Sequence, residues 1–168
     1  MSISLSSLVN PSQLTLGTAQ TLSGTAVGFT GIPTGVKQIQ LILQNISVSA
    51  TARIYIQLGS GSYTTTGYNS YCLSIASSGT ITKEGSTSGF DMATGVGSDY
   101  AWTIVNLINI TNNNWQCNFT TCGYSGSTTF AFINSGNINL SGVLDRVRIT
   151  TSNGTDTFDA GTANITYQ

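Results

Sequence analysis

Few side chains in this sequence could do chemistry, and histidine is absent from its 168 residues. Without histidine there is no general base for Ser-His-Asp or Cys-His catalysis and no imidazole ligand for zinc. The three cysteines, Cys72, Cys117 and Cys122, contain no Cys-x-x-Cys pair. Cys117 shares its parity with Trp115 and Phe119, which predicts a thiol packed in the core. A Cys117–Cys122 disulfide across a turn is the alternative, and a cytoplasmic origin argues against it.

The carboxylates Asp145, Asp156 and Asp159 lie close together near the C-terminus. A glycosidase needs two facing carboxyl groups, one of them with a raised pKa. Two arginines lie among these aspartates and would lower their pKa values instead. We therefore expect a protein that is not an enzyme and that uses no cofactor. Asn153, Asp156 and Asp159 could alternatively supply oxygen ligands to calcium, although they lack EF-hand spacing.

The charge content narrows the classes of partner. Charged residues make up 7% of the chain and the net charge is −1, so no basic patch is available to bind nucleic acid. No apolar run approaches the roughly 18 residues of a membrane helix. The opening MSISLSSLVNPSQL lacks the basic and apolar regions of a secretory signal, so we expect synthesis in a cytoplasm and no membrane partner. Weak charge repulsion also permits close packing against copies of the same chain.

Alternation of apolar and polar residues predicts strands along the chain. Its longest run is Ile46 to Leu58, where the even positions are apolar, and a bend is expected near Ala50. Gln44-Asn45 is predicted to be a turn that pairs 37–43 with 46–58. Segment 84–99 is predicted to be a loop. Shorter alternating segments occur at 71–75, 102–110, 115–119 and 130–132.

These strands and the absence of any helical pattern predict an all-β fold. About eight to ten short strands, separated by turn residues, favour an antiparallel β-sandwich, jelly-roll-like in form. Residues 1–25 are expected to form an N-terminal arm or the first strands. Residues 26–168 are expected to form the β-sandwich domain.

The dipeptide Asn153-Gly154 is a strong signal for a two-residue hairpin turn. Such a turn would place Ile149 opposite Phe158 on one face and Arg148 opposite Asp159 on the other. The sequence therefore predicts a structural ion pair between Arg148 and Asp159. That pair would fix the register of the hairpin or hold a subunit contact.

Tyr63 and Tyr68 lie in the glycine-rich stretch GSGSYTTTGYNS. Aromatic side chains on such turns can stack on sugars or line protein interfaces. We therefore predict that Tyr63 and Tyr68 are exposed and make surface contacts.

Three stretches resemble a module of tailed-bacteriophage virion proteins: GIPTGVKQIQLIL (31–43), IYIQLGSGSYTTTGY (54–68) and LDRVRITTSNGTDTFDAGTANITYQ (144–168). The module occurs at the ends of tail fibres and in small phage proteins of unassigned role. The stretches cover about a third of the chain, and 84–140 is not diagnostic. The resemblance implies a structural role in the virion and often trimeric assembly. It carries over no catalytic or binding residues.

Two functions follow as expectations. A fibre needs a long shaft, yet only about 30 residues precede the first matching stretch, which favours a capsid decoration (cement) protein. Such a protein would be a homotrimer that clamps the shell through contacts with the major capsid protein. The alternative is a tail-fibre component or receptor-binding tip that recognises a host-surface glycan or protein. A glycan-cleaving enzyme is a third and weaker alternative.

Overall fold

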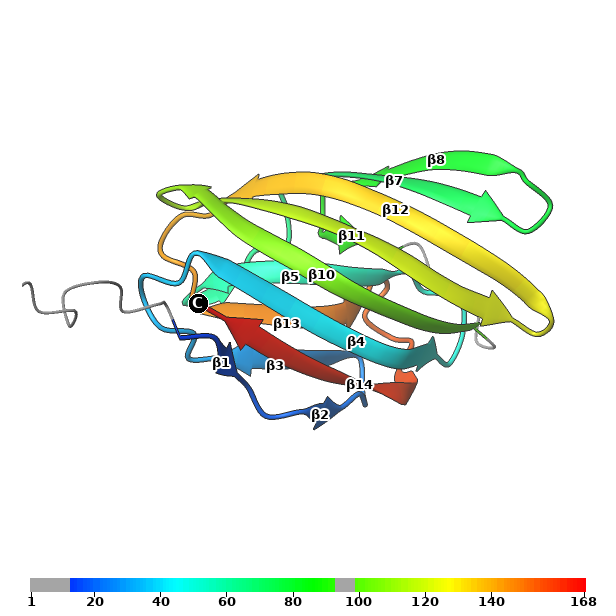
Figure 1. The fold of residues 1–168 in the computed structure, drawn as a ribbon, viewed down its shortest axis with the longest axis horizontal. Helices are drawn as coiled ribbons and strands as arrows, with labels where there is room; N and C mark the ends of the chain where they lie inside the picture. Colours follow the sequence, from blue (N-terminus) through cyan, green and yellow to red (C-terminus); the bar gives the residue numbers. More distant parts are fainter. Residues whose placement is uncertain (1–12, 93–98) are drawn as a thin grey trace, which may run out of the picture.

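The computed structural model describes residues 13–92 and 99–168, and their regular structure is entirely β (Figure 1). Fourteen strands form two antiparallel sheets that pack as a sandwich, which confirms the predicted fold class. Four of the strands have only two residues, so ten longer strands correspond to the eight to ten expected. Within the described part of the chain there is no helix that could span a membrane.

The larger sheet contains nine strands. Its order is β1 (Thr15–Leu16), β14 (Phe158–Tyr167), β4 (Gln38–Val48), β10 (Asp99–Thr111), β11 (Asn114–Ser125), β12 (Thr128–Asn139), β7 (Asn69–Ala76) and β8 (Ile81–Ser86). Strand β2 (Gln20–Thr21) pairs with β14 beside β1. The first described strands are thus part of this sheet, and residues 1–12 of the expected arm lie outside the described residues.

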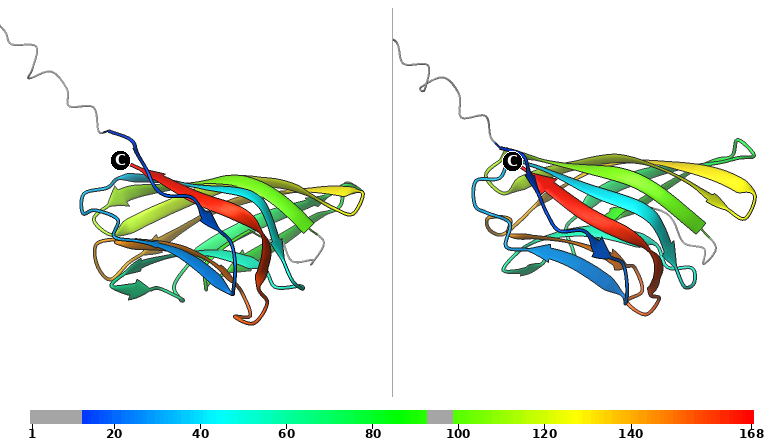
Figure 2. Two further views of the ribbon diagram at one scale, coloured as in Figure 1. Left: turned by 90° about the horizontal axis from the view of Figure 1, so that it is seen from below. Right: turned by 60° about the horizontal axis from the view of Figure 1, so that its bottom comes forward.

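The smaller sheet contains five strands, in the order β3 (Ala26–Thr30), β13 (Arg146–Thr151), β5 (Ile54–Ser60) and β6 (Ser62–Tyr63), with β9 (Phe90–Asp91) paired to β5. Figure 2 shows the two sheets as stacked layers. The core lies between them, because alternate residues of each facing strand point inward. Its fully buried members include Ile39, Leu41, Ile54, Ile56, Leu58, Val105, Leu107, Val147 and Ile149.

The hairpin predicted from 37–43 and 46–58 is wrong. Residues 38–48 form the single strand β4, and Asn45 (φ 58°) lies at a β-bulge in it, where the register with β10 shifts. Before the bulge the odd-numbered residues of β4 face the core, and after it the even-numbered residues do. In the sequence, this switch from odd to even positions resembles a turn between two strands. The chain then crosses to the smaller sheet over 49–53, where the bend near Ala50 was expected, and continues as β5.

The predicted closing hairpin is also wrong. Strand β13 pairs with β3 and β5 in the smaller sheet, whereas β14 pairs with β4 in the larger one. Arg148 is opposite Gly28 and Gln57, and Asp159 is exposed on β14, so the predicted register and its Arg148–Asp159 pair are not formed. Ile149 and Phe158 both enter the core, but they do so from different sheets.

Two crossing segments explain why this turn does not close a hairpin. Segments 49–53 and 152–157 both run from one sheet to the other, and they hydrogen-bond to each other. Ala52 N–H donates to Asp156 Oδ2 at 2.8 Å, and Ser49 N–H donates to the Thr157 carbonyl at 2.8 Å. Gly154 does adopt a positive φ of 68°, so the turn is present, but it belongs to a corner of the sandwich.

Segment 84–99 is not a simple loop, because β8 extends to Ser86 and β9 follows at Phe90–Asp91. Residues 93–98 of this prediction lie outside the described residues. Phe90 and Met92 are fully buried. The segment therefore supplies part of the core.

The cysteines are free thiols. Cys117 is buried in the core, as predicted, and Cys72 is buried on β7. Cys117 and Cys122 lie on the same strand, β11, with Cys122 exposed. Residues five apart in one strand point to opposite faces of the sheet, which excludes the disulfide considered as an alternative.

Candidate functional site: the outer face of the larger sheet

The outer face of the larger sheet carries large apolar side chains in solvent. On β10 the odd positions from Ala101 to Leu107 enter the core, so the even positions point outward. Four of those even positions are apolar and between 41% and 53% exposed: Trp102, Ile104, Ile108 and Ile110. Both faces of β10 are therefore apolar, whereas a sheet with one wet face normally has polar residues on it.

One end of this face carries large apolar side chains on six strands. Ile104 pairs with Ile42 on β4, and Ile133 on β12 pairs with Leu73 on β7. Trp102 and Ile81 extend the same area, and Tyr124 lies beside Trp102 with ring centroids 5.8 Å apart. We call this surface the apolar band; it consists of Ile42, Leu73, Ile81, Trp102, Ile104, Tyr124 and Ile133.

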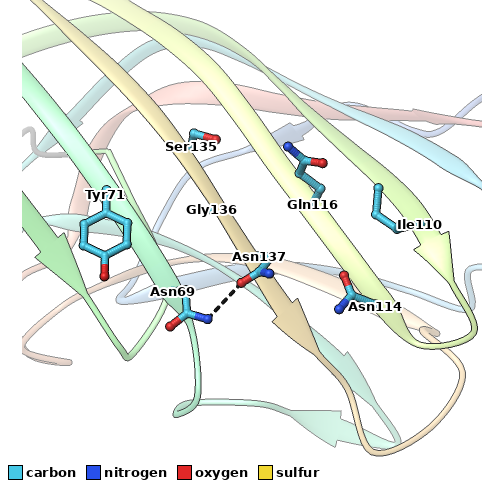
Figure 3. A pocket seen from close by; sticks show the side chains of 8 residues that line it. All are labelled: Asn69, Tyr71, Ile110, Asn114, Gln116, Ser135, Gly136 and Asn137. Atoms are coloured by element: carbon cyan, nitrogen blue, oxygen red, sulfur yellow. Dashed lines mark hydrogen bonds between the residues drawn. The ribbon is translucent and has the colours of Figure 1, made fainter.

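The other end of the face is a shallow groove lined mainly by amide side chains, drawn in Figure 3. Gln116, Asn137 and Asn69 form one row across β11, β12 and β7, and Ser135 and Tyr71 form the next pair. The groove has a volume of about 530 Å³. We call it the amide groove; its lining is Asn69, Tyr71, Ile110, Asn114, Gln116, Ser135, Gly136 and Asn137.

Neither surface contains a charged residue. Lys83 on the edge strand β8, opposite Leu73, borders the apolar band. In the amide groove, Asn69 Nδ2–H donates to Asn137 Oδ1 at 3.0 Å, and this bond is drawn in Figure 3. The residues of the two surfaces can therefore make van der Waals contacts and neutral hydrogen bonds, and the charge beside the band comes from Lys83.

Two of the predicted site residues, Arg148 on β13 and Tyr63 on β6, lie in the smaller sheet. Arg148 Nε–H donates to Gln57 Oε1 at 2.7 Å, and its guanidinium lies 4.4 Å from the centroid of the Tyr63 ring. The Tyr63 hydroxyl occupies the space that a side chain at Gly28 would fill. Tyr63 is thus half-buried under an arginine, and its ring is engaged within the protein.

Tyr68 was predicted to be exposed, and this is wrong, because it is only 1% exposed. Its hydroxyl accepts from Leu58 N–H at 2.8 Å and donates to the Thr64 carbonyl at 3.1 Å. Its ring packs edge-to-face on Phe90 with centroids 5.0 Å apart. Burial raises the pKa of Tyr68 above its ordinary value. Tyr68 therefore anchors the glycine-rich stretch to the core.

Replacing Tyr68 with phenylalanine should destabilise the protein by about 1–3 kcal/mol, because a buried polar partner of Leu58 N–H is lost. Urea unfolding monitored by tryptophan fluorescence measures this change. Tyr71→Phe is the matched control, since it removes a hydroxyl at an exposed position and should change stability by less than about 0.5 kcal/mol. Equal stabilities for Tyr68→Phe and the parent would contradict the anchoring role.

Two of the three C-terminal carboxylates, Asp145 and Asp156, make separate contacts, and Asp159 is exposed on β14. Asp145 Oδ1 accepts from Arg146 Nε–H at 2.7 Å, and this hydrogen bond lowers the Asp145 pKa, the opposite of what a general acid needs. Asp156 accepts from Ala52 N–H, and Asn153 Oδ1 accepts from the backbone N–H groups of Thr155 and Asp156. In the described ranges no group of three or more acidic, histidine or cysteine residues could hold a metal.

An ionic cluster around the buried Asp91 was missed from the sequence. Arg53 Nε–H donates to Asp91 Oδ1 at 2.9 Å, a second guanidinium nitrogen lies 2.7 Å from Asp91 Oδ2, and Arg53 also pairs with Glu84. The Asp91 side chain is 1% exposed. The cluster connects the start of β5 to β9 and to the edge strand β8. Arg53 lies in an alternating run as a polar position, and nothing local indicates its partners.

Comparisons with known proteins add no relative: no family model matches this chain, and neither the curated proteins nor the solved structures contain a match.

Proposed function

We propose that this chain is a structural protein of a tailed-bacteriophage virion, of the capsid-decoration type, and that it works as a homotrimer. The phage-like stretches at 31–43, 54–68 and 144–168 motivate the virion role. The observation that carries the assembly role is the apolar band, because an exposed apolar area of a few hundred Å² or more on a soluble protein often marks an interaction site. We assign the band to a second copy of this chain.

The size of the band suits an interface between subunits. Six of its seven side chains are between 39% and 61% exposed, which amounts to apolar surface on the order of 500 Å² when a large side chain presents about 150–250 Å². A standard interface buries about 800 Å² per partner, of which roughly 60% is apolar. The exposed apolar area of the band is therefore similar to the apolar area that one partner buries in a standard interface.

The charge distribution also favours association between copies. The band residues themselves are uncharged and Lys83 lies beside them on the edge strand β8, so three subunits arranged around a threefold axis can bury the band while the ammonium group stays at the rim of the interface. A chain with a net charge of −1 has weak long-range repulsion between copies. On a shell, many such trimers, each making modest contacts with the major capsid protein, would reinforce the assembly through multivalency.

Introducing charge into the band should dissociate the oligomer. We expect the parent chain to be a trimer by native mass spectrometry, and the double variant Ile104→Lys with Ile133→Lys to be a folded monomer, because each assembled interface would bury unpaired ammonium groups. Thr155→Lys adds one charge at an exposed corner and should leave the trimer intact. A parent chain that is monomeric at micromolar concentration would overturn the assignment of the band.

Copy number in purified virions tests the decoration role. Quantitative mass spectrometry should find the chain in abundance comparable to the major shell protein. A few copies per particle would reject decoration and favour the tail-fibre or receptor-binding tip. The copy number in virions does not affect the test of the oligomeric state by native mass spectrometry, because that test uses the isolated chain.

A further inference from the structure

We infer that the amide groove is a binding site for an uncharged saccharide, with Tyr71 as its stacking platform. This goes beyond the proposed function, since assembly through the apolar band does not use the groove. The groove adjoins the band, since Tyr71 and Ser135 lie two residues along their strands from Leu73 and Ile133, but the two surfaces share no residue. The assignment replaces Tyr63 and Tyr68, whose rings are engaged within the protein.

The hydrogen-bonding groups of the groove match those of sugar hydroxyls. A hydroxyl donates one hydrogen bond and accepts others, and a side-chain amide offers both an acceptor oxygen and two donor hydrogens. Gln116, Asn137 and Asn69 are in register on three adjacent strands. Neighbouring strands lie about 4.8 Å apart, so the row presents amides at intervals across roughly 10 Å. That width exceeds the separation of opposite hydroxyls on one pyranose ring and suits a disaccharide.

Tyr71 supplies the apolar contact that a sugar ring needs. It is 72% exposed, more than any other large apolar side chain in residues 13–92 and 99–168. Figure 3 shows its ring at one side of the groove, with the amides of β12 and β11 next to it and Ile110 at the far side. An aromatic face beside hydrogen-bonding groups combines a flat apolar contact with directional polar ones. The groove volume of about 530 Å³ lies in the range of small-molecule sites.

The absence of charge in the lining selects the class of saccharide. No lysine or arginine lines the groove to pair with a carboxylate, sulfate or phosphate group, and no acidic residue is present to bind an amino sugar in its cationic form. Burying a ligand charge without a partner is costly. Neutral hexoses and N-acetylhexosamines are therefore the expected ligands, and acidic sugars are disfavoured.

Binding of the full chain to an array of neutral and acidic oligosaccharides, followed by calorimetric titration of the best neutral ligand, tests this assignment. We expect neutral oligosaccharides to bind and acidic ones to bind more weakly. Tyr71→Ala and Asn137→Ala should each weaken binding about tenfold or more, because each removes a contact worth about 1.4 kcal/mol. Tyr71→Phe keeps the ring and should retain most of the affinity.

Two controls separate this site from folding and from assembly. Gln44→Ala removes an exposed amide of the same face outside the groove and should leave affinity unchanged, and thermal unfolding of every variant should match the parent. The Ile104→Lys, Ile133→Lys double variant should still bind sugar, whether or not the band forms a trimer. Binding to no neutral sugar at millimolar concentration, preference for acidic sugars, or unchanged affinity in Tyr71→Ala would each overturn the inference.

Discussion

Replacing Arg53 with methionine is expected to lower the free energy of unfolding by about 3–5 kcal/mol, which is the usual cost of removing one partner of a buried ion pair. The Asp91 carboxylate is 1% exposed and receives two guanidinium contacts, at 2.7 and 2.9 Å. Methionine keeps most of the side-chain volume but provides no donor. The Asp91 carboxylate would lose the guanidinium beside it while remaining buried.

The same cluster connects several strands, so its loss should weaken the packing of more than one strand. Asp91 N–H donates to Ser70 Oγ, and Asn134 Nδ2–H donates both to that hydroxyl and to the Asp91 carbonyl. Strands β9, β7 and β12 therefore share one polar network next to the core. Chemical denaturation of Arg53→Met should show a reduced midpoint and an unchanged slope if the network supports the native state alone.

Arg148→Met is the matched control, because Arg148 contacts the neutral Gln57 and the Tyr63 ring. Its cost should be about 1 kcal/mol. Adding Asp91→Asn to Arg53→Met should recover part of the lost stability, since removing both charges is less costly than leaving one. A loss below about 1 kcal/mol in Arg53→Met would show that the pair is not structurally important.

Stability should fall steeply at alkaline pH. Burial raises the pKa of Cys72 from 9.0 to about 11, and it raises the pKa values of Cys117 and Tyr68 above their ordinary ones. Above about pH 9 the unfolded chain releases these protons whereas the folded chain retains them. The folded state then binds more protons, so the free energy of unfolding decreases as pH rises. These three groups contribute no such loss below about pH 9.

Cys72 alone should account for a loss on the order of 2 kcal/mol between about pH 8 and pH 11, since one unit of pKa difference corresponds to about 1.4 kcal/mol, and Cys117 and Tyr68 add to that loss. Urea unfolding at a series of pH values measures it. Cys117→Ala should flatten the alkaline limb, because one buried acid is removed. Cys122→Ala changes an exposed thiol and should leave the profile as it is. A free energy of unfolding that stays constant up to about pH 11 would contradict this account.

The fold class and much of the core could be predicted from the sequence because strand burial has a local period of two residues. The even positions from Ile46 to Leu58 are buried with the exception of Ala50. Cys117 enters the core at the same parity as Trp115 and Phe119. The turn at Asn153-Gly154 also forms, because it depends on the conformational freedom of those two residues.

Which strands pair was not predictable from those same residues. Arg148 and Asp159 were assigned to one hairpin, yet the corner at 152–157 carries the chain from one sheet to the other and is held by hydrogen bonds to 49–53, a hundred residues earlier in the chain. Apolar and polar residues alternate along β4 and β5, and this alternation indicates neither the bulge in β4 nor the corner between the two strands. The period of two residues indicates which side of a strand is buried, but it does not indicate the sheet to which the strand belongs.

The candidate surfaces depended on the tertiary structure for the same reason. Tyr71, Asn69, Gln116 and Asn137 come from three strands, and only the order β11-β12-β7 brings them into one groove. Trp102 and Ile104 resemble core residues in the sequence, because both faces of β10 are apolar. Composition established that the chain has little charge and no histidine, and the alternation of its residues predicted that it is all-β. The assembled sheet decided which of its uncharged side chains face solvent, because side-chain exposure depends on what each face packs against.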